Sequence, residues 1–319
     1  MSRRLGAETL SIRARRAALA LALAFLLSLT AALPCVAAGT VVVASKIDTE
    51  GALLGNMMVL LLRAHGIAVD NRLQLGPTQI VRQAMLAGQI DLYPEYTGDG
   101  AIFFARESDP AWHDAARAYA LVKQLDHDTN NIVWLTAAPA DNAWAIAVRR
   151  DLAQTQKLTS LADFARHANA GGTVELAVSA EFVDSPGALP AFEKAYGFKL
   201  ARSQLLTLIG GNTAATERAA AEGISGVNAA MAYTTDGALA VLQLQLLADD
   251  KHAQTVYQPA PVIRGAVLAQ HPEIQGILEP VFRSLTLERL QQLNARIAAD
   301  GDAPAAVASE YLRANGFLR

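Results

Sequence analysis

The chain has 319 residues and a formal net charge of −3, and its one cysteine is Cys35. The first 38 residues carry five arginines and one glutamate, a net +4, so the rest of the chain carries −7 and no cysteine. This acidic balance argues against nucleic acid as a partner, and a chain without cysteine can use neither a disulfide nor a cysteine nucleophile. The remaining residues, about 280, suffice for two ordinary domains or one large one.

Residues 1–38 have the layout of a secretory signal peptide. A basic start precedes the apolar run AALALALAFLLSLTAALP and the small residues VAAG. This pattern predicts a secreted protein that is cleaved after Ala38. The apolar run is near the length of a membrane span, so a transmembrane anchor is the alternative interpretation. Because Cys35 follows Pro34, a poor match to a lipid-attachment site, we expect it to be removed with the signal peptide.

Strand and helix patterns alternate in the first part of the predicted mature chain. The β-branched run TVVVASK is typical of a buried parallel strand, and Asp48 or Thr49 can cap the helix after it. The predicted elements are strands over 40–46, 67–75 and 90–96 and helices over 49–66 and 78–88. Residues 91–100, DLYPEYTGDG, then lie at the C-terminal end of a strand, where open α/β sheets bind ligands.

A second block with the same alternation begins at NAWAIAVRR. Its predicted elements are strands over 142–150, 173–182 and 226–237 and helices over 158–168, 189–198 and 213–223, with Ser160 as a candidate cap. The third strand ends in Tyr-Thr-Thr-Asp-Gly, a second tyrosine-led acidic corner. We interpret the two corners, one in each block, as opposing walls of a cleft.

The chain then returns to the first block. A strand is predicted over 255–264, followed by helices over 274–285, 286–299 and 303–317. Two α/β lobes that the chain crosses twice form a hinged clamshell, which can close around a small ligand. The predicted boundaries are 39–142 together with 254–319 for lobe 1, and 143–253 for lobe 2.

Besides simple capture of a small ligand between the lobes, the chain could be an enzyme or a regulatory binding module. The histidines are scattered without the H-E-x-x-H spacing, GISG is not a nucleophile elbow, and the glycine-containing loops lack a phosphate-binding fingerprint. We therefore expect no catalysis, no metal and no cofactor. A sensor or regulatory binding module of the same fold stays open, because fold alone does not determine function.

Five motifs in chain order resemble the periplasmic binding proteins of glycine betaine/choline-type ABC importers, in particular the osmoprotectant-uptake branch of Gram-negative bacteria. They are ASKIDTEGALLGNMMVLLLRAHG, GPTQIVRQAMLAGQIDLYPEYTGDGA, NAWAIAVRR, AMAYTTDG and YQPAPVIR, and together they cover essentially the whole chain after Ala38. The resemblance implies an α/β, type II periplasmic-binding-protein fold with two lobes joined by two hinge strands. It also implies a small quaternary-ammonium ligand such as glycine betaine or choline, and a membrane permease as partner. We expect the protein to be a monomer.

The implied ligand explains the aromatic residues. A quaternary ammonium has no N–H to donate, so aromatic faces hold it, each contact contributing about 0.5–2 kcal/mol. The cage residues of the family correspond to Tyr96, Trp144, Tyr233 and Tyr257, with Trp144 in place of the usual tyrosine. Tyr93 is expected to point the other way, into the core.

The carboxylate of a betaine needs hydrogen-bond donors. The family lysine that follows the first strand corresponds to Lys46, which precedes a helix N-terminus that favours anions. The family arginine is replaced by Ser185, and this change weakens the expected recognition of a carboxylate. Asp99, where relatives have a small hydroxyl residue, either attracts the ammonium or caps a helix. Thr234 is a candidate ligand contact or a corner residue, and Asp236 is expected to be structural.

Overall fold

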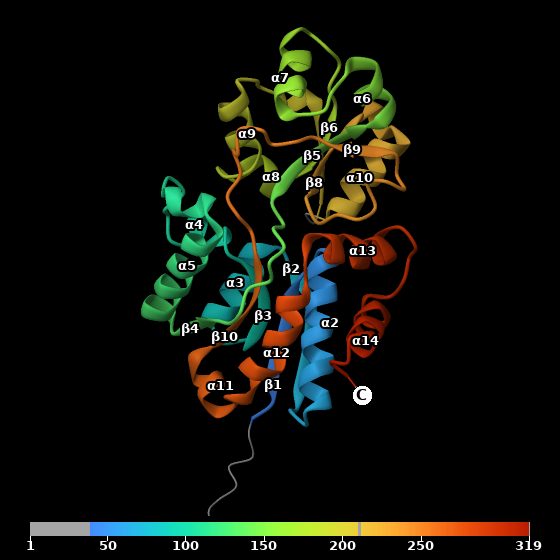
Figure 1. Ribbon diagram of the computed structural model, residues 1–319. Helices are drawn as coiled ribbons and strands as arrows, with labels where there is room; N and C mark the ends of the chain where they lie inside the picture. The colour runs from blue at the N-terminus through green and yellow to red at the C-terminus, as the bar shows by residue number, and fades with distance from the viewer. Residues whose placement is uncertain (1–38, 210–211, 319) are drawn as a thin grey trace, which may run out of the picture. The chain divides into compact units, whose positions relative to one another are not determined.

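The computed structural model describes residues 39–209 and 212–318. The predicted signal peptide, residues 1–38, lies outside this part of the chain. Within the described residues, no helix has the length and apolar character that crossing a membrane requires. The chain forms two five-stranded sheets with helices packed against them (Figure 1).

The first sheet has the strand order β2-β1-β3-β10-β4. Its strands are β1 (Val41–Lys46), β2 (Val69–Gly76), β3 (Leu92–Tyr96), β4 (Ile132–Trp134) and β10 (Pro259–Arg264). Strand β1 pairs in parallel with β2 and β3, whereas β10 pairs antiparallel with β3 and β4. A strand from late in the chain therefore completes the sheet, as the sequence predicted.

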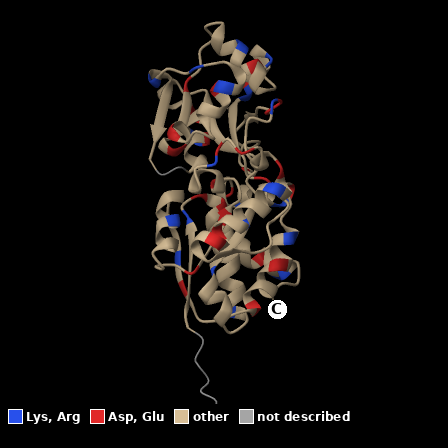
Figure 2. Cartoon of the chain, turned by 90° about the vertical axis from the view of Figure 1, so that its left-hand side faces the viewer, with Lys and Arg blue, Asp and Glu red and all other residues tan. Residues whose placement is uncertain are grey.

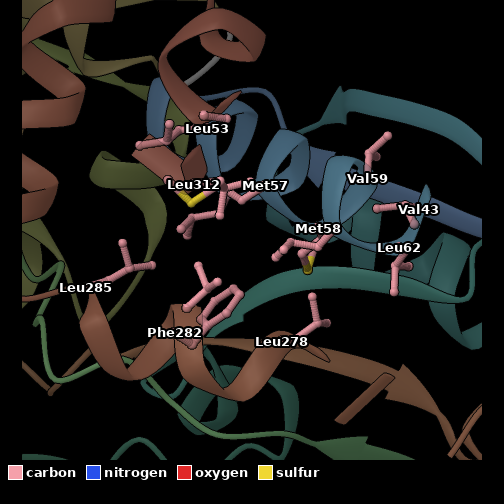
Figure 3. Close-up of a cluster of buried hydrophobic side chains, with 14 of the residues drawn as sticks. Val43, Leu53, Met57, Met58, Val59, Leu62, Leu278, Phe282, Leu285 and Leu312 are labelled. Atoms are coloured by element: carbon pink, nitrogen blue, oxygen red, sulfur yellow. The ribbon is translucent and has the colours of Figure 1, made fainter. Parts of the chain in front are cut away.

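Most helices of this part of the chain come directly before or after its strands. They are α2 (Thr49–Ala64), α3 (Thr78–Leu86), α4 (Asp99–Phe103), η1 (Pro110–His113), α5 (Ala115–Asn130), α11 (Gly265–Gln270), α12 (Glu273–Ser284), α13 (Leu287–Ala298) and α14 (Pro304–Ala314). Helix α2 is the centre of the largest apolar cluster (Figure 3), which joins its Met57 and Met58 to Leu278 and Phe282 of α12. This burial fixes α2, and the site described below lies at its N-terminal end.

The second sheet has the order β7-β6-β8-β5-β9. Its strands are β5 (Trp144–Arg149), β6 (Leu176–Ser179), β7 (Leu205–Leu208), β8 (Ala229–Tyr233) and β9 (Leu244–Leu246). Its helices are α6 (Arg150–Gln156), α7 (Leu161–Asn169), α8 (Ala180–Asp184), α9 (Leu189–Tyr196), η2 (Arg202–Gln204), α10 (Thr213–Glu222) and η3 (Ile224–Gly226). Strands β6, β7 and β8 run parallel, and β5 runs antiparallel between β8 and β9, just as β10 runs antiparallel between β3 and β4 in the first sheet.

The chain passes between the sheets twice, after β4 and after β9. The two crossing segments are hydrogen-bonded to each other, since the Asn142 amide donates to the Tyr257 carbonyl at 2.9 Å. The Tyr257 amide in turn donates to the Asp141 carboxylate at 2.7 Å. The lobe boundaries near residues 142 and 254 stay a prediction, which this topology supports.

Several predicted elements differ from those in the structure. The strand predicted over 173–182 ends at Ser179, because the Ser179 hydroxyl accepts from the Phe182 amide at 3.1 Å and caps α8. The strand predicted over 255–264 begins only at Pro259. The sequence analysis assigned no elements to β4, β7 and β9, which are three or four residues long, or to α5. The caps predicted at Asp48 and Ser160 are confirmed.

Charged residues of both signs are interspersed on the side of the molecule shown in Figure 2. Among the described residues, no group of three histidine, cysteine or acidic side chains is placed to hold a metal ion.

Candidate functional site

One cavity brings together six of the seven residues that the sequence analysis selected. It has about 310 Å³ of empty space, open solvent included. Its lining residues are Lys46, Asp48, Thr78, Tyr96, Asp99, Asn142, Trp144, Glu181, Tyr233 and Tyr257. Residues of both sheets and of both crossing segments thus meet at one site.

The first aromatic wall is formed where β3 and β10 lie side by side. Tyr96, the last residue of β3, is opposite Pro259 at the start of β10, so Tyr257 lies just beyond the end of the pair. A side chain at Gly98 would meet the Tyr257 ring, since a Cβ added there would lie 2.6 Å from it. Glycine at this position therefore allows the Tyr257 ring to lie against the turn that follows Tyr96.

The second aromatic wall comes from the antiparallel pair β5 and β8. Trp144 begins β5 and is directly opposite Tyr233, which ends β8. Their ring centroids are 4.5 Å apart, and the Phe182 ring of α8 lies 5.3 Å from Trp144 on a tilted plane. These contacts hold the two cavity-lining rings in place, because paired aromatic rings stabilise each other beyond simple burial.

Lys46 is paired with two acids, Glu95 of β3 and Asp99 at the start of α4. Its Nζ atom lies 2.7 Å from Glu95 Oε1 and 2.5 Å from Asp99 Oδ2. Burial alone would lower the pKa of Lys46, but the nearby carboxylates of Asp99 and Glu95 outweigh it and raise the pKa above its ordinary value. The same ammonium lies 4.8 Å from the centroid of the Tyr96 ring. A ligand carboxylate would have to share this lysine with both acids.

The acids around the lysine are deeply buried. Burial raises the pKa of Glu95 to about 7, although Lys46 opposes the shift. Asp99 is not the cap of α4: the N-cap is Gly98, and Asp99 lies in the first turn with its carboxylate on Lys46. The helix-cap interpretation of Asp99 is therefore wrong, because the lysine takes up its side chain.

The lining carries an excess of negative charge. Asp48, Asp99 and Glu181 face a single lysine. The N-terminus of α2, expected to favour an anion, is already occupied by Asp48, whose carboxylate accepts from the Gly51 amide at 2.7 Å. The electrostatics of this cavity thus suit a cation better than an anion.

Thr234 is the one selected residue that the cavity does not include. Its hydroxyl accepts from the Ala143 amide at 3.0 Å and donates to the Asp141 carbonyl at 2.5 Å. It therefore ties the β8 corner to the first crossing segment, and a ligand contact stays a prediction. Tyr93 is fully buried and donates to Glu95 at 2.6 Å, so its predicted core position is confirmed.

The sequence analysis missed Glu50 and Asn142. Glu50 is 4 % exposed and accepts hydrogen bonds from the Tyr96 hydroxyl at 3.1 Å and from Asn142 Nδ2 at 2.9 Å. In the sequence, Glu50 has the signal of an ordinary acid in the first turn of a helix, and nothing local shows that it is buried.

Comparisons with known proteins show the family of the chain. Residues 39–314 match the family described as the substrate binding domain of the ABC-type glycine betaine transport system. The chain is 54% identical over 287 residues to the glycine betaine-binding protein YehZ of Escherichia coli (strain K12), covering 90% of this chain and 94% of that protein.

Two solved structures show the same fold. A structure of apo YehZ from Escherichia coli has 55% identity and a TM-score of 0.66, and the match covers 88% of this chain and all of that one (100%). A crystal structure described as a glycine betaine/carnitine/choline ABC transporter has a TM-score of 0.68 at 21% identity, covering 87% of this chain and 99% of that chain.

The two sheets and these matches show the type II periplasmic-binding-protein fold, as predicted. More specifically, the chain belongs to the family of substrate-binding proteins of ABC-type glycine betaine transport systems.

Proposed function

We propose that the chain captures a quaternary-ammonium osmoprotectant, such as glycine betaine or choline, in the cavity between its two aromatic walls and delivers it to an ABC permease. The observation that carries this proposal is the set of four aromatic residues, Tyr96, Trp144, Tyr233 and Tyr257, that line one acidic cavity. The names of its relatives, a glycine betaine-binding protein and a glycine betaine/carnitine/choline transporter, support the same ligand class.

The proposed binding follows from the chemistry of the lining. Aromatic faces attract a desolvated cation without needing an N–H donor, and burial strengthens that attraction. The excess of acids adds long-range attraction for a cation. We therefore propose that the ammonium end supplies most of the binding free energy, and that any carboxylate end relies on Lys46, which already has two acidic partners.

The proposal includes the arrangement of the whole protein. The lobes would comprise residues 39–142 with 254–319, and residues 143–253, supported by the two separate sheets. Closure about the crossing segments near Trp144 and Tyr257 would desolvate the cation. We further propose a periplasmic, monomeric protein that releases its signal peptide after Ala38 and catalyses no reaction.

A calorimetric titration tests the ligand class. The protein starting at Gly39 is unfolded and refolded to remove carried-over ligand, and then titrated with glycine betaine, choline, carnitine and proline betaine. We expect saturable heat with at least one of them. A folded protein that gives no heat across the series would contradict the proposal and point to a sensor or carrier of another small molecule.

A further inference from the structure

Glu50 is a buried carboxylate that receives its hydrogen bonds only from neutral groups among the described residues. Oε1 accepts from the Tyr96 hydroxyl and from Asn142 Nδ2, and Oε2 accepts from Asn294 Nδ2 at 2.8 Å. A buried carboxylate without a cationic partner is costly, and burial raises the pKa of Glu50 to about 7. Such a group calls for an explanation beyond helix stability.

Asn294, on α13, links Glu50 of α2 to the corner that follows β8. Its Nδ2 atom also donates to the Thr235 carbonyl at 3.1 Å. One turn earlier on α13, Gln291 Nε2 donates to the Thr234 carbonyl at 2.9 Å. Helix α13 thus holds two consecutive carbonyls of the segment 234–237, here called the β8 corner.

Gly237 allows the helix to approach the β8 corner this closely. A Cβ added at Gly237 would lie 1.9 Å from the Gln291 carbonyl oxygen and 2.6 Å from the Ala295 amide nitrogen. Both atoms belong to the backbone of α13, so no side-chain movement would relieve the contact. Any larger residue would move the corner away from the helix.

We propose that Glu50 is a positioning residue that couples cation capture at Tyr96 to the contact between α13 and the β8 corner. Oε1 of Glu50 orients the Tyr96 ring, which would face the ligand. Oε2 orients the side-chain amide of Asn294, which holds the β8 corner. The same carboxylate fixes Asn142 in the first crossing segment. This inference rests on the proposed function for its ligand, while its structural half is testable without one.

The substitution Glu50→Gln isolates this role. The amide oxygen of the new side chain replaces Oε1 and keeps Tyr96 and Asn142, but its NH₂ group then faces the NH₂ group of Asn294. Asn294 Oδ1 is buried and has no hydrogen-bond partner among the described residues, so this amide can turn to accept from the new NH₂ group. Turning removes the donor from the Thr235 carbonyl, so the variant breaks one of the two side-chain hydrogen bonds that join α13 to the β8 corner, while the bond from Gln291 and the hydrogen bond of the cage remain.

The first test compares the wild-type protein, E50Q and a matched control by stopped-flow tryptophan fluorescence with glycine betaine and choline. The control is E193Q, because Glu193 is also buried but lies on α9, where it accepts from Lys199 and the Leu200 amide. We expect E50Q to bind about tenfold more weakly through a faster off-rate, with the on-rate unchanged. E193Q should keep both rates.

The second test is hydrogen exchange of the amides at 234–237 without ligand. We expect about tenfold faster exchange in E50Q than in the wild-type protein or E193Q, because the Thr235 carbonyl loses its hydrogen bond from Asn294 of α13. G237A should show the same faster exchange through steric displacement, with Glu50 intact.

The outcomes separate the inference from the proposed function. Unchanged affinity and exchange in E50Q, or a slower on-rate with unchanged exchange, would overturn the coupling while the ligand assignment stands. If the wild-type protein binds neither amine, the proposed function fails. Hydrogen exchange still tests the link from Glu50 through Asn294 to the β8 corner in that case. Faster exchange in E50Q supports this link, and unchanged exchange overturns it.

Discussion

The corners that follow β3 and β8 share the pattern Tyr-Thr, one further residue, then Asp-Gly, yet their aspartates have different surroundings. Asp99 lines the cavity and pairs with Lys46 at 2.5 Å. Asp236 accepts from the Tyr233 amide at 2.6 Å and is not among the cavity's lining residues. Burial beside Asp236 raises the pKa of its neighbour Glu217 above the ordinary value.

The difference comes from the elements around each corner. The strand next to β3 ends in Lys46, whereas the equivalent strand β6 ends in Ser179, which caps a helix. The residue before the corner tyrosine also differs, Glu95 in one case and Ala232 in the other. The same short motif therefore forms an acidic wall in one sheet and a self-contained turn in the other, and both present a tyrosine to the cavity.

The largest expected effect is a fall in stability with rising pH that comes from Glu95 in the first corner. A raised carboxyl pKa means that the folded protein holds its proton more tightly than the unfolded chain, so this stabilisation is lost as pH rises through the folded pKa. For Glu95, whose pKa rises from 4.5 to about 7, the loss between pH 4.5 and 7 is on the order of 3 kcal/mol. Urea unfolding at pH 5 and pH 7.5 should show this decline and a smaller one in Glu95→Gln. An equal fall in the free energy of unfolding between the two pH values in both proteins would contradict this assignment to Glu95.

Loss of either corner tyrosine should weaken ligand binding by a similar amount. Tyr96→Ala and Tyr233→Ala each remove one face of the proposed cage, at a cost of about 2 kcal/mol or some 30-fold in affinity. Calorimetry with the best ligand measures this loss. Tyr119→Ala is the control, since Tyr119 packs elsewhere and donates to the Leu135 carbonyl. Unchanged affinity in both cage variants would rule out the cage.

The aspartates should behave differently. Asp99→Asn removes a charge from the cavity lining and should weaken cation binding about tenfold. Asp236→Asn should leave affinity within about threefold and lower the free energy of unfolding by about 1 kcal/mol, because the Tyr233 amide loses a charged acceptor. Paired calorimetry and urea unfolding measure both. If the two variants showed the same loss of affinity, the distinction between the corners would be wrong.

The smallest expected effect concerns ligand choice. Ser185 follows α8, and the same loop contains Gly187, where an added Cβ would lie 3.6 Å from the Tyr257 hydroxyl. Ser185→Arg adds a cation near the cavity and should raise the affinity for glycine betaine relative to choline by a few-fold. Ser185→Gln controls for side-chain size. If Ser185→Arg does not change the ratio of the affinities for glycine betaine and choline, the missing arginine does not explain ligand choice.

Much of the site could be predicted because its residues end or begin strands. Hydrophobic runs placed Tyr96 at the end of β3, and the antiparallel register of β5 and β8 brought Trp144 and Tyr233 together. Their contact with a ligand stays a prediction. Shorter elements were missed because three or four residues carry too little periodic signal to mark a strand.

The two-sheet fold, the family and the aromatic positions could all be predicted from the sequence, because helix caps, apolar runs and ordered motifs are local properties of the chain. The ion pairs and side-chain hydrogen bonds around the site could not be predicted from the sequence, because they form only in the folded chain. Lys46 meets Asp99 across 53 positions, and Glu50 meets Asn294 across 244. Such contacts depend on which strand ends and helices the fold brings together, and a buried carboxylate looks the same in the sequence as one exposed to water.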